Sequence, residues 1–348
     1  MEFVVIKIFV LTTLSFIVAM AWTPLLTHLL YKYKLGKQIR DAKSAPIFAA
    51  LHKEKAGTPT MGGVLVWFTA LILALMFYFL AQWTSFGIFQ YLNFLSRPQT
   101  LLPLGVLVAS ALVGLVDDLF NVKRIGPSGG GLRMRHRLII YTLIAAVGAL
   151  WFYFKLDWDT LRIPFWGSIS IGAWYIPIFI FVIVATSFSV NEIDGLDGLA
   201  GGTLMAAFAA YGAIAFAQGR YDLAAFCGVI IGGLLAFLWF NIHPARFFMG
   251  DTGAMSLGVT LGVIAMLTNT VFLLPIIGFL FVVESLSVLL QLASKKLRHG
   301  KKIFLSSPIH HHLQAKGWPE PKIVMRFWVI AGVTAVLGIS LALLDLTF

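Results

Sequence analysis

Six carboxylates stand in three short polar segments of an otherwise apolar chain. The six are Asp117 and Asp118, then Glu192, Asp194 and Asp197 within the glycine-rich stretch that starts at Asn191, and Asp251. Two adjacent aspartates repel each other unless a cation compensates their charge. Mg²⁺ binds through a few carboxylates and keeps coordination positions for water and substrate phosphates. The Asp117-Asp118 pair therefore favours a Mg²⁺ site, and a solvated helix cap is the alternative.

The segment Gly250-Asp251-Thr252-Gly253 strengthens the metal and phosphate interpretation. Glycines let the backbone approach a phosphate closely, and the helix that follows offers its N-terminal N–H groups to an anion. The sequence thus contains two acidic segments suited to a diphosphate substrate.

A run of three histidines, His310-His311-His312, lies in the longest basic connection. Three consecutive imidazoles cannot all face one metal from a regular helix, so we expect one or two to face substrate phosphate while another orients the loop. Zinc binding is disfavoured because spaced Cys or His partners are missing. The single cysteine, Cys227, lies in an apolar run and excludes a disulfide framework.

Lys55 and Thr60 belong to the segment Lys-Ala-Gly-Thr-Pro-Thr-Met-Gly-Gly. An ammonium group and threonine hydroxyls could bind a nucleotide or a diphosphate. The order of residues differs from a Walker P-loop, which has a Lys-Ser/Thr pair after its glycines. A plain turn at the start of a helix is the alternative.

The elements that position these residues must be membrane helices. The chain of 348 residues is 59% hydrophobic and 12% charged, whereas a soluble domain has about 25% charged residues. A spanning helix needs about 20 apolar residues. The sequence predicts an all-α polytopic membrane protein with one domain over residues 1–348 and about ten spans, near 3–29, 61–81, 101–120, 137–155, 172–190, 199–217, 222–240, 254–270, 272–293 and 324–346.

The basic residues predict the orientation of these spans. Twenty of the 26 lysines and arginines fall in the odd-numbered connections and four in the even-numbered ones. By the positive-inside rule, the odd connections and the acidic segments face the cytoplasm, and both termini lie outside. The net charge of +11 therefore reflects orientation, with a second role in holding anionic lipid, and we expect no nucleic-acid partner. Outside, residues 161–171 suggest a small β-hairpin.

Taken together, these motifs resemble the polyprenyl-phosphate N-acetylhexosamine-1-phosphate transferase superfamily over nearly the whole chain. The most discriminating part is the run of three histidines followed by Gly317, Glu320 and Arg326-Phe327-Trp328. This pattern resembles the branch that acts on a muramoyl-pentapeptide, because the branch that transfers N-acetylglucosamine phosphate has a differently spaced His-x-His motif. A transferase of that second branch remains the alternative within the superfamily.

The resemblance implies transfer of phospho-MurNAc-pentapeptide from UDP-MurNAc-pentapeptide to undecaprenyl phosphate, with release of UMP and a requirement for Mg²⁺. It implies a bacterial cytoplasmic (inner) membrane location, a cytoplasmic active-site cleft and a bent ninth helix. A homodimer is left open. The implied catalytic residues are Asp117, Asp118, Asp251, which also binds the metal, and His310. The implied substrate-binding residues are Lys55, Thr60, Asn191, Asp194, Asp197, Asn241, His311 and His312.

Two positions depart from the family pattern. Glu192-Ile193 replaces the usual Leu-Thr, which adds a charge and removes a hydroxyl, and Arg137 replaces a lysine. Arginine keeps the charge but presents a wider planar fork. For the reaction, we favour direct attack by the lipid phosphate, with Asp117 accepting its proton, over a two-step route through an aspartyl intermediate. A secondary transporter or flippase is the rival class, although transporter sites typically lie near the bilayer midplane.

Overall fold

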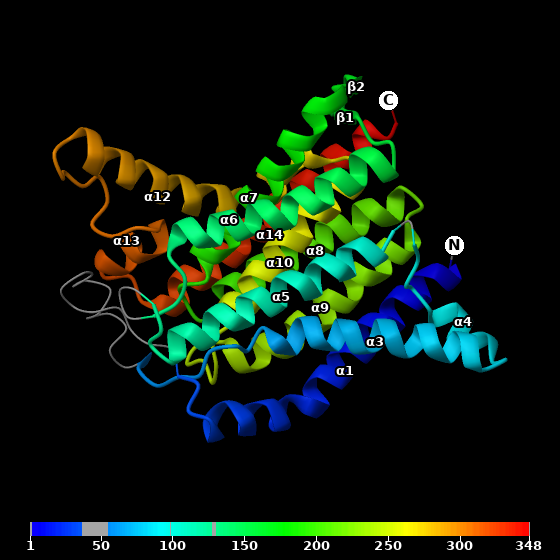
Figure 1. The fold of residues 1–348 in the computed structure, drawn as a ribbon, viewed down its shortest axis with the longest axis horizontal. Helices are drawn as coiled ribbons and strands as arrows, with labels where there is room; N and C mark the ends of the chain where they lie inside the picture. Colours follow the sequence, from blue (N-terminus) through cyan, green and yellow to red (C-terminus); the bar gives the residue numbers. More distant parts are fainter. Residues whose placement is uncertain (1, 37–54, 98, 127–129, 348) are drawn as a thin grey trace.

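The protein is a bundle of long helices with one two-stranded sheet at one end (Figure 1). The computed structural model describes residues 2–36, 55–97, 99–126 and 130–347. Within these residues, nine helices are long and apolar enough to cross a membrane, or ten if one bent pair of helices counts as a single span. The predicted class, a polytopic α-helical membrane protein, is confirmed. The predicted first and second cytoplasmic connections fall partly outside the described residues, at 37–54 and 127–129.

The helices begin and end within a few residues of the predicted spans. They are α1 (Glu2–Lys32), α3 (Val64–Trp83), α5 (Leu101–Val122), α6 (Met134–Leu150) with the π-helical turn η3 (Trp151–Lys155), η4 (Gly172–Trp174) leading into α7 (Tyr175–Ile193), α8 (Leu199–Ala217), α9 (Tyr221–Asn241), α10 (Gly250–Leu267) and α14 (Glu320–Asp345), with the short α4 (Gly87–Leu92) after α3.

The predicted ninth span is broken, as the family resemblance implied. It consists of η5 (Val271–Leu273), α11 (Leu274–Ile277) and α12 (Phe279–Leu297), and the two parts meet at an angle of 82°. Gly278, between them, has non-helical backbone angles. Figure 1 shows α12 leaving the bundle, with the short helix α13 (Ile309–Ala315) beside it. The leucines at 286, 289, 290 and 292 are exposed on α12, whereas its polar Glu284 and Gln291 are buried.

The predicted hairpin is also present. Strands β1 (Thr160–Ile163) and β2 (Gly167–Ser170) pair antiparallel, with Thr160 opposite Ser170. Asp345 at the end of α14 accepts hydrogen bonds from Arg162 Nε (2.5 Å) and the Phe165 N–H (2.7 Å). The hairpin and both termini lie at the end of the bundle opposite α13 (Figure 1). Which side of the membrane this end faces remains a prediction.

Helix α10 forms the centre of the bundle and has α3 and α5 packed against its first turn. Nearly every residue of α10 is buried. A Cβ added to Gly63 would lie 2.3 Å from Gly253 Cα, and one added to Gly114 would lie 2.4 Å from the Asp251 carbonyl oxygen. Such distances are shorter than any van der Waals contact, so only glycine lets α3 and α5 approach α10 this closely. This approach places the three acidic segments at one end of the bundle.

Candidate active site

Two carboxylates from different helices share one guanidinium. Asp117 lies in the last turns of α5, and Asp251 lies in the first turn of α10. Arg137, near the start of α6, places its Nε 2.7 Å from Asp117 Oδ2 and its Nη2 2.8 Å from Asp251 Oδ2. We call Asp117, Asp118, Arg137 and Asp251 the carboxylate cluster. Its three acids outnumber its one cation, so the cluster favours additional positive charge.

The Oδ1 atoms of Asp117 and Asp251 also accept hydrogen bonds. Asp117 Oδ1 accepts a hydrogen bond of 2.6 Å from the Leu132 N–H. Asp251 Oδ1 accepts one of 2.6 Å from Asn191 Nδ2, and Arg137 Nη1 donates to Asn191 Oδ1 over 3.3 Å. Asn191 belongs to the last turn of α7. Four membrane helices therefore meet at this cluster through polar side chains.

Asp118 is held differently from its neighbour Asp117. Its Oδ1 accepts a hydrogen bond from the Thr60 hydroxyl (3.1 Å), and its Oδ2 accepts one from the Thr252 N–H (3.0 Å). The side chains of Thr60 and Asp118 are both buried. The Thr252 N–H belongs to the first turn of α10, where a negative charge is stabilised by the unpaired N–H groups and the helix dipole. Asp118 thus connects α5, α10 and the segment before α3.

A short ladder of backbone hydrogen bonds sets the segment before α3 alongside the start of α10. The Phe248 N–H donates to the Pro59 carbonyl (2.8 Å), the Gly62 N–H to the Phe248 carbonyl (2.8 Å) and the Gly63 N–H to the Met249 carbonyl (2.9 Å). This ladder brings two motifs that are far apart in the sequence to one place. Gly253, one of the two glycines predicted to approach a phosphate, lies against Gly63, because a Cβ added to it would be 2.8 Å from Gly63 Cα.

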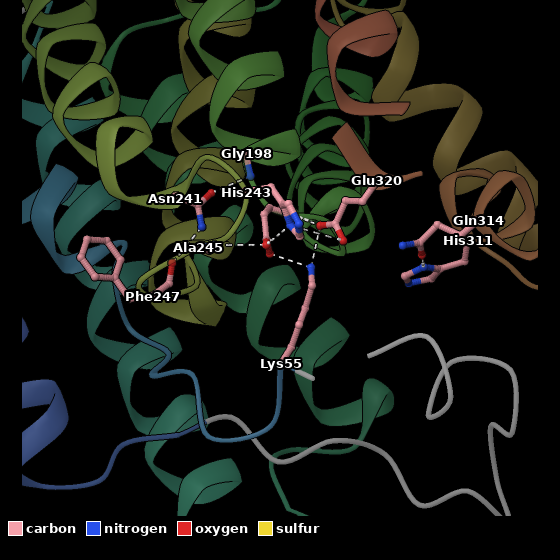
Figure 2. A network of polar contacts seen from close by, with 10 residues as sticks. Lys55, Gly198, Asn241, His243, Ala245, Phe247, His311, Gln314 and Glu320 are labelled. Carbon is pink, nitrogen blue, oxygen red and sulfur yellow. Dashed lines mark hydrogen bonds and ion pairs between the residues drawn. The ribbon is translucent and has the colours of Figure 1, made fainter. Parts of the chain in front are cut away.

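A second group of charges surrounds Lys55, and we call Lys55, Asp197, His243 and Glu320 the lysine cluster (Figure 2). Lys55 Nζ donates to Asp197 Oδ1 (2.7 Å) and to Glu320 Oε1 (2.6 Å). His243 Nδ1 lies 2.9 Å from Asp197 Oδ2, and Glu320 Oε1 also accepts the Asp197 N–H over 2.6 Å. The Asp197 side chain is only 3% exposed. A buried carboxylate needs such partners, because an unpaired charge away from water is costly.

Asn241 fixes the loop that carries Asp197. Its Oδ1 accepts the Gly198 N–H (2.9 Å), and its Nδ2 donates to the Phe247 carbonyl (2.8 Å), as Figure 2 shows. Trp328 Nε1 donates to the Gly198 carbonyl (3.0 Å). Asp194 is the C-terminal capping residue of α7 and is half-buried. This loop connects Asn191, which contacts the carboxylate cluster, to Asp197 of the lysine cluster.

The three histidines lie on α13 and have different surroundings. His310 is fully buried, with its Nδ1 3.0 Å from Glu284 Oε2. His311 Nδ1 lies 2.9 Å from Gln314 Oε1 (Figure 2). His312 Nδ1 accepts the Leu305 N–H over 3.1 Å, which requires an unprotonated nitrogen. Desolvation, followed by the nearby Lys316 charge, lowers the pKa of His312, in keeping with that role.

Two places could hold a cation. In the described part of the chain, one group of three His, Cys, Asp or Glu side chains offers ligand atoms within 4.8 Å of one another, and it is Asp197, His243 and Glu320. The Lys55 ammonium already contacts both of those carboxylates. In the carboxylate cluster, Asp117 and Asp251 converge on one guanidinium, and Asp251 keeps 19% of its side chain exposed. Two oxygen ligands that converge on a cation and keep access to solvent fit Mg²⁺ chemistry.

Sequence reasoning missed several partners of the predicted residues. It linked His243 and Glu284 to no other residue and used Glu320 only as part of a family pattern. It noted Arg137 as a departure without a contact. A usable signal was the rarity of charge, because a charged side chain inside or beside an apolar span usually has a partner of opposite charge.

The comparisons with known proteins fit a membrane-bound transferase. Residues 100–269 match Glycosyl transferase family 4, and residues 55–65 match signature 1 of the phospho-N-acetylmuramoyl-pentapeptide-transferases. The helix bundle, the acidic residues at its helix ends and the family match together define the chain as a polytopic membrane glycosyl transferase.

Curated relatives narrow this class. A phospho-N-acetylmuramoyl-pentapeptide-transferase of Chloroflexus aggregans is 40% identical over 329 residues, which are 91% of this chain and 84% of the relative. The phospho-N-acetylmuramoyl-pentapeptide-transferase of a Geobacillus species is 38% identical over 94% of this chain and 95% of the relative. That of Listeria innocua is 36% identical over 94% of this chain and 96% of the relative. The chain belongs to the phospho-N-acetylmuramoyl-pentapeptide-transferase family.

Proposed function

We propose that the protein transfers phospho-MurNAc-pentapeptide from UDP-MurNAc-pentapeptide to undecaprenyl phosphate, giving undecaprenyl-diphospho-MurNAc-pentapeptide (lipid I) and UMP for peptidoglycan synthesis. The observation that carries this proposal is the convergence of Asp117 and Asp251 on one cation at the ends of membrane helices. In a reaction between two anionic phosphates, one of them attached to a membrane lipid, positive charge is needed where the two phosphates meet.

The lysine cluster is proposed to receive the nucleotide end of the donor. Lys55 Nζ also lies 5.9 Å from the centre of the Phe248 ring, so a cation and an aromatic face stand side by side. Asp197, on the adjoining loop, and Asn241, at the end of α9, supply hydrogen-bonding groups. The further contacts proposed for the donor are Thr60, Asn191, Asp194, His311 and His312.

Asp251 is proposed to hold Mg²⁺, with Asp117 as its neighbour. Bound there, Mg²⁺ would neutralise diphosphate charge and stabilise the departing UMP. Arg137 would have to withdraw from Asp251 or share it, because its Nη2 lies 2.8 Å from Oδ2. The implied cofactor is thus compatible with the residues present and competes with one of them.

The remaining roles fall to the chain's own acids and to His310. The Leu132 N–H and Arg137 favour the ionised form of Asp117, and the role proposed for this carboxylate is to accept a proton from the lipid phosphate. Asp118 positions the first turn of α10 through the Thr252 N–H. His310 is proposed to contact the donor phosphates. The site is proposed to face the cytoplasm from a single domain in the bacterial inner membrane.

The proposal is tested by Asp117→Asn and Asp251→Asn in purified protein, with UMP release measured at several Mg²⁺ concentrations. Loss of either carboxylate should reduce turnover by at least about 100-fold, the scale typical of lost transition-state stabilisation. Asp157→Asn is the matched control, because Asp157 is exposed near the hairpin and has a φ of 52° that asparagine tolerates. Near-normal turnover in both cluster variants would contradict the assignment.

The same assay separates the alternatives. UMP release in detergent, where no gradient exists, excludes a transporter or flippase. A direct comparison of UDP-MurNAc-pentapeptide with UDP-N-acetylglucosamine tests the sister activity. A phospho-sugar adduct trapped on the protein without lipid acceptor would favour the two-step route over direct attack.

A further inference from the structure

Glu284 is a buried acid that the proposed reaction does not use. It lies in α12, the bent part of the ninth span, and its side chain has no exposed surface. A lone carboxylate at such a depth is costly unless it is paired and hydrogen-bonded. The partner that faces it is the imidazole of His310, on α13, the helix that carries the histidines.

The first contact is with the His310 side chain. The His310 Nδ1 lies 3.0 Å from Glu284 Oε2, and neither side chain has exposed surface. The Glu284 carboxylate therefore lies directly against the imidazole ring that projects from the first turn of α13.

The opposite edge of the His310 ring faces Gly195. A Cβ added to Gly195 would lie 2.2 Å from His310 Nε2 and 2.9 Å from Cε1. Any side chain at this position would occupy the place of the ring. The His310 imidazole is thus held between Glu284 on one side and the loop between Asp194 and Asp197 on the other.

Helix α12 is itself fixed to the helix that carries Asn191. Ser285, next to Glu284, donates from its Oγ to Ser189 Oγ over 2.7 Å, and Ser189 lies on α7. Two residues further along α7 is Asn191, which contacts Asp251. A continuous set of contacts thus connects Glu284 to the carboxylate cluster.

We propose that Glu284 is a positioning residue for the reaction, which orients the His310 imidazole so that its Nε2 edge faces the Asp194–Asp197 loop. The proposal rests on the proposed function for its effect on turnover, and its structural part stands independently. A charged partner on Nδ1 fixes the position of the proton on an imidazole, and loss of such a supporting residue typically lowers activity about 10- to 100-fold.

The test is Glu284→Gln in purified full-length protein with ¹⁵N-labelled histidine. Glutamine keeps the shape of the side chain but loses the carboxylate. We expect turnover to fall by roughly 10- to 100-fold while the Kd for UMP changes by less than about threefold. The ¹⁵N signals of the His310 ring should shift as well. Ser287→Ala is the control, because Ser287 is buried one turn away and bonds only within α12.

A second variant approaches the ring from the other side. Gly195→Ala places a methyl group where His310 Nε2 now lies, so it should shift the same ¹⁵N signals and lower turnover. The Gly195→Ala variant also tests the proposal if Glu284→Gln fails to fold. Unchanged ring signals and turnover would overturn the proposal, as would a loss of turnover with an equal loss of UMP binding and unchanged ring signals. If the wild type releases no UMP, the proposed function fails, and the ring signals still decide the orientation.

Discussion

Arg137 Nη2 lies 2.8 Å from Asp251 Oδ2, so the carboxylate proposed to bind Mg²⁺ already has a cation against it. The same guanidinium reaches Asp117 through its Nε. Both contacts depend on the breadth of the arginine fork, because a lysine ammonium is a single point charge. The family pattern has lysine at this position, so the competition between side chain and metal is a property of this chain.

Arg137→Lys should therefore lower the Mg²⁺ concentration needed for half-maximal UMP release. A lysine could keep only one of the two contacts, with Asp117 or with Asp251. If Mg²⁺ binding then becomes about 1 kcal/mol more favourable, the metal binds roughly fivefold more tightly. A Mg²⁺ titration of turnover measures this shift. Arg135→Lys, an exposed change on the same helix, is the control and should leave the titration unchanged. A higher Mg²⁺ requirement in Arg137→Lys would show that the guanidinium assists the metal.

Asp118→Asn should lower stability as well as activity. The Thr60 hydroxyl and the Thr252 N–H donate to different oxygens of Asp118, and asparagine replaces one of these oxygens with an NH2 group, so one donor loses its present acceptor. A buried hydrogen bond left unmade costs about 1–3 kcal/mol. Thermal unfolding in detergent, at one scan rate for all variants, measures the change, and Thr60→Val should show part of it. An unfolding temperature equal to wild type, with activity lost, would assign Asp118 to the chemistry alone.

Lys55→Met should destabilise the folded protein and weaken UMP binding. The change leaves Asp197 and Glu320 close together without their ammonium, and their side chains are only 3% and 9% exposed. Removing one partner from a buried ion pair costs roughly 3 kcal/mol. Unfolding temperature and calorimetric UMP binding measure the two effects.

The double variant Lys55→Met with Glu320→Gln separates the effects on stability and on UMP binding. It removes one of the two uncompensated charges, so it should recover part of the stability without recovering the affinity for UMP. Full recovery of both would mean that Lys55 only neutralises its neighbours and does not contact the nucleotide.

The predicted orientation is tested by cysteine labelling. Cys227 is fully buried, so the wild type gives little background with a membrane-impermeant maleimide. A cysteine in place of the exposed Glu2 should react in intact cells, whereas one in place of the exposed His299 should react only after permeabilisation. The reverse pattern would place both termini in the cytoplasm.

The spans were predictable because membrane insertion is decided locally. A run of about 20 apolar residues satisfies the bilayer whatever its neighbours are, and the structure has a helix or bent pair at each predicted run. The hairpin at 161–171 was predictable for a related reason, since its turn residues and alternating pattern lie within one segment. The short α13 was not predicted, because its position depends on contacts with another helix, such as that of His310 with Glu284 on α12.

The sequence by itself determined the membrane class and the family, and it placed the acids in three segments near the predicted cytoplasmic ends of the spans. Only the tertiary structure decided which side chains meet. Arg137 and Asp251 are 114 residues apart, and Lys55 and Glu320 are 265 residues apart. No local pattern encodes such pairs, because they depend on how closely glycine-containing helices pack around α10. That packing lets one guanidinium reach two carboxylates and sets His310 between Glu284 and Gly195.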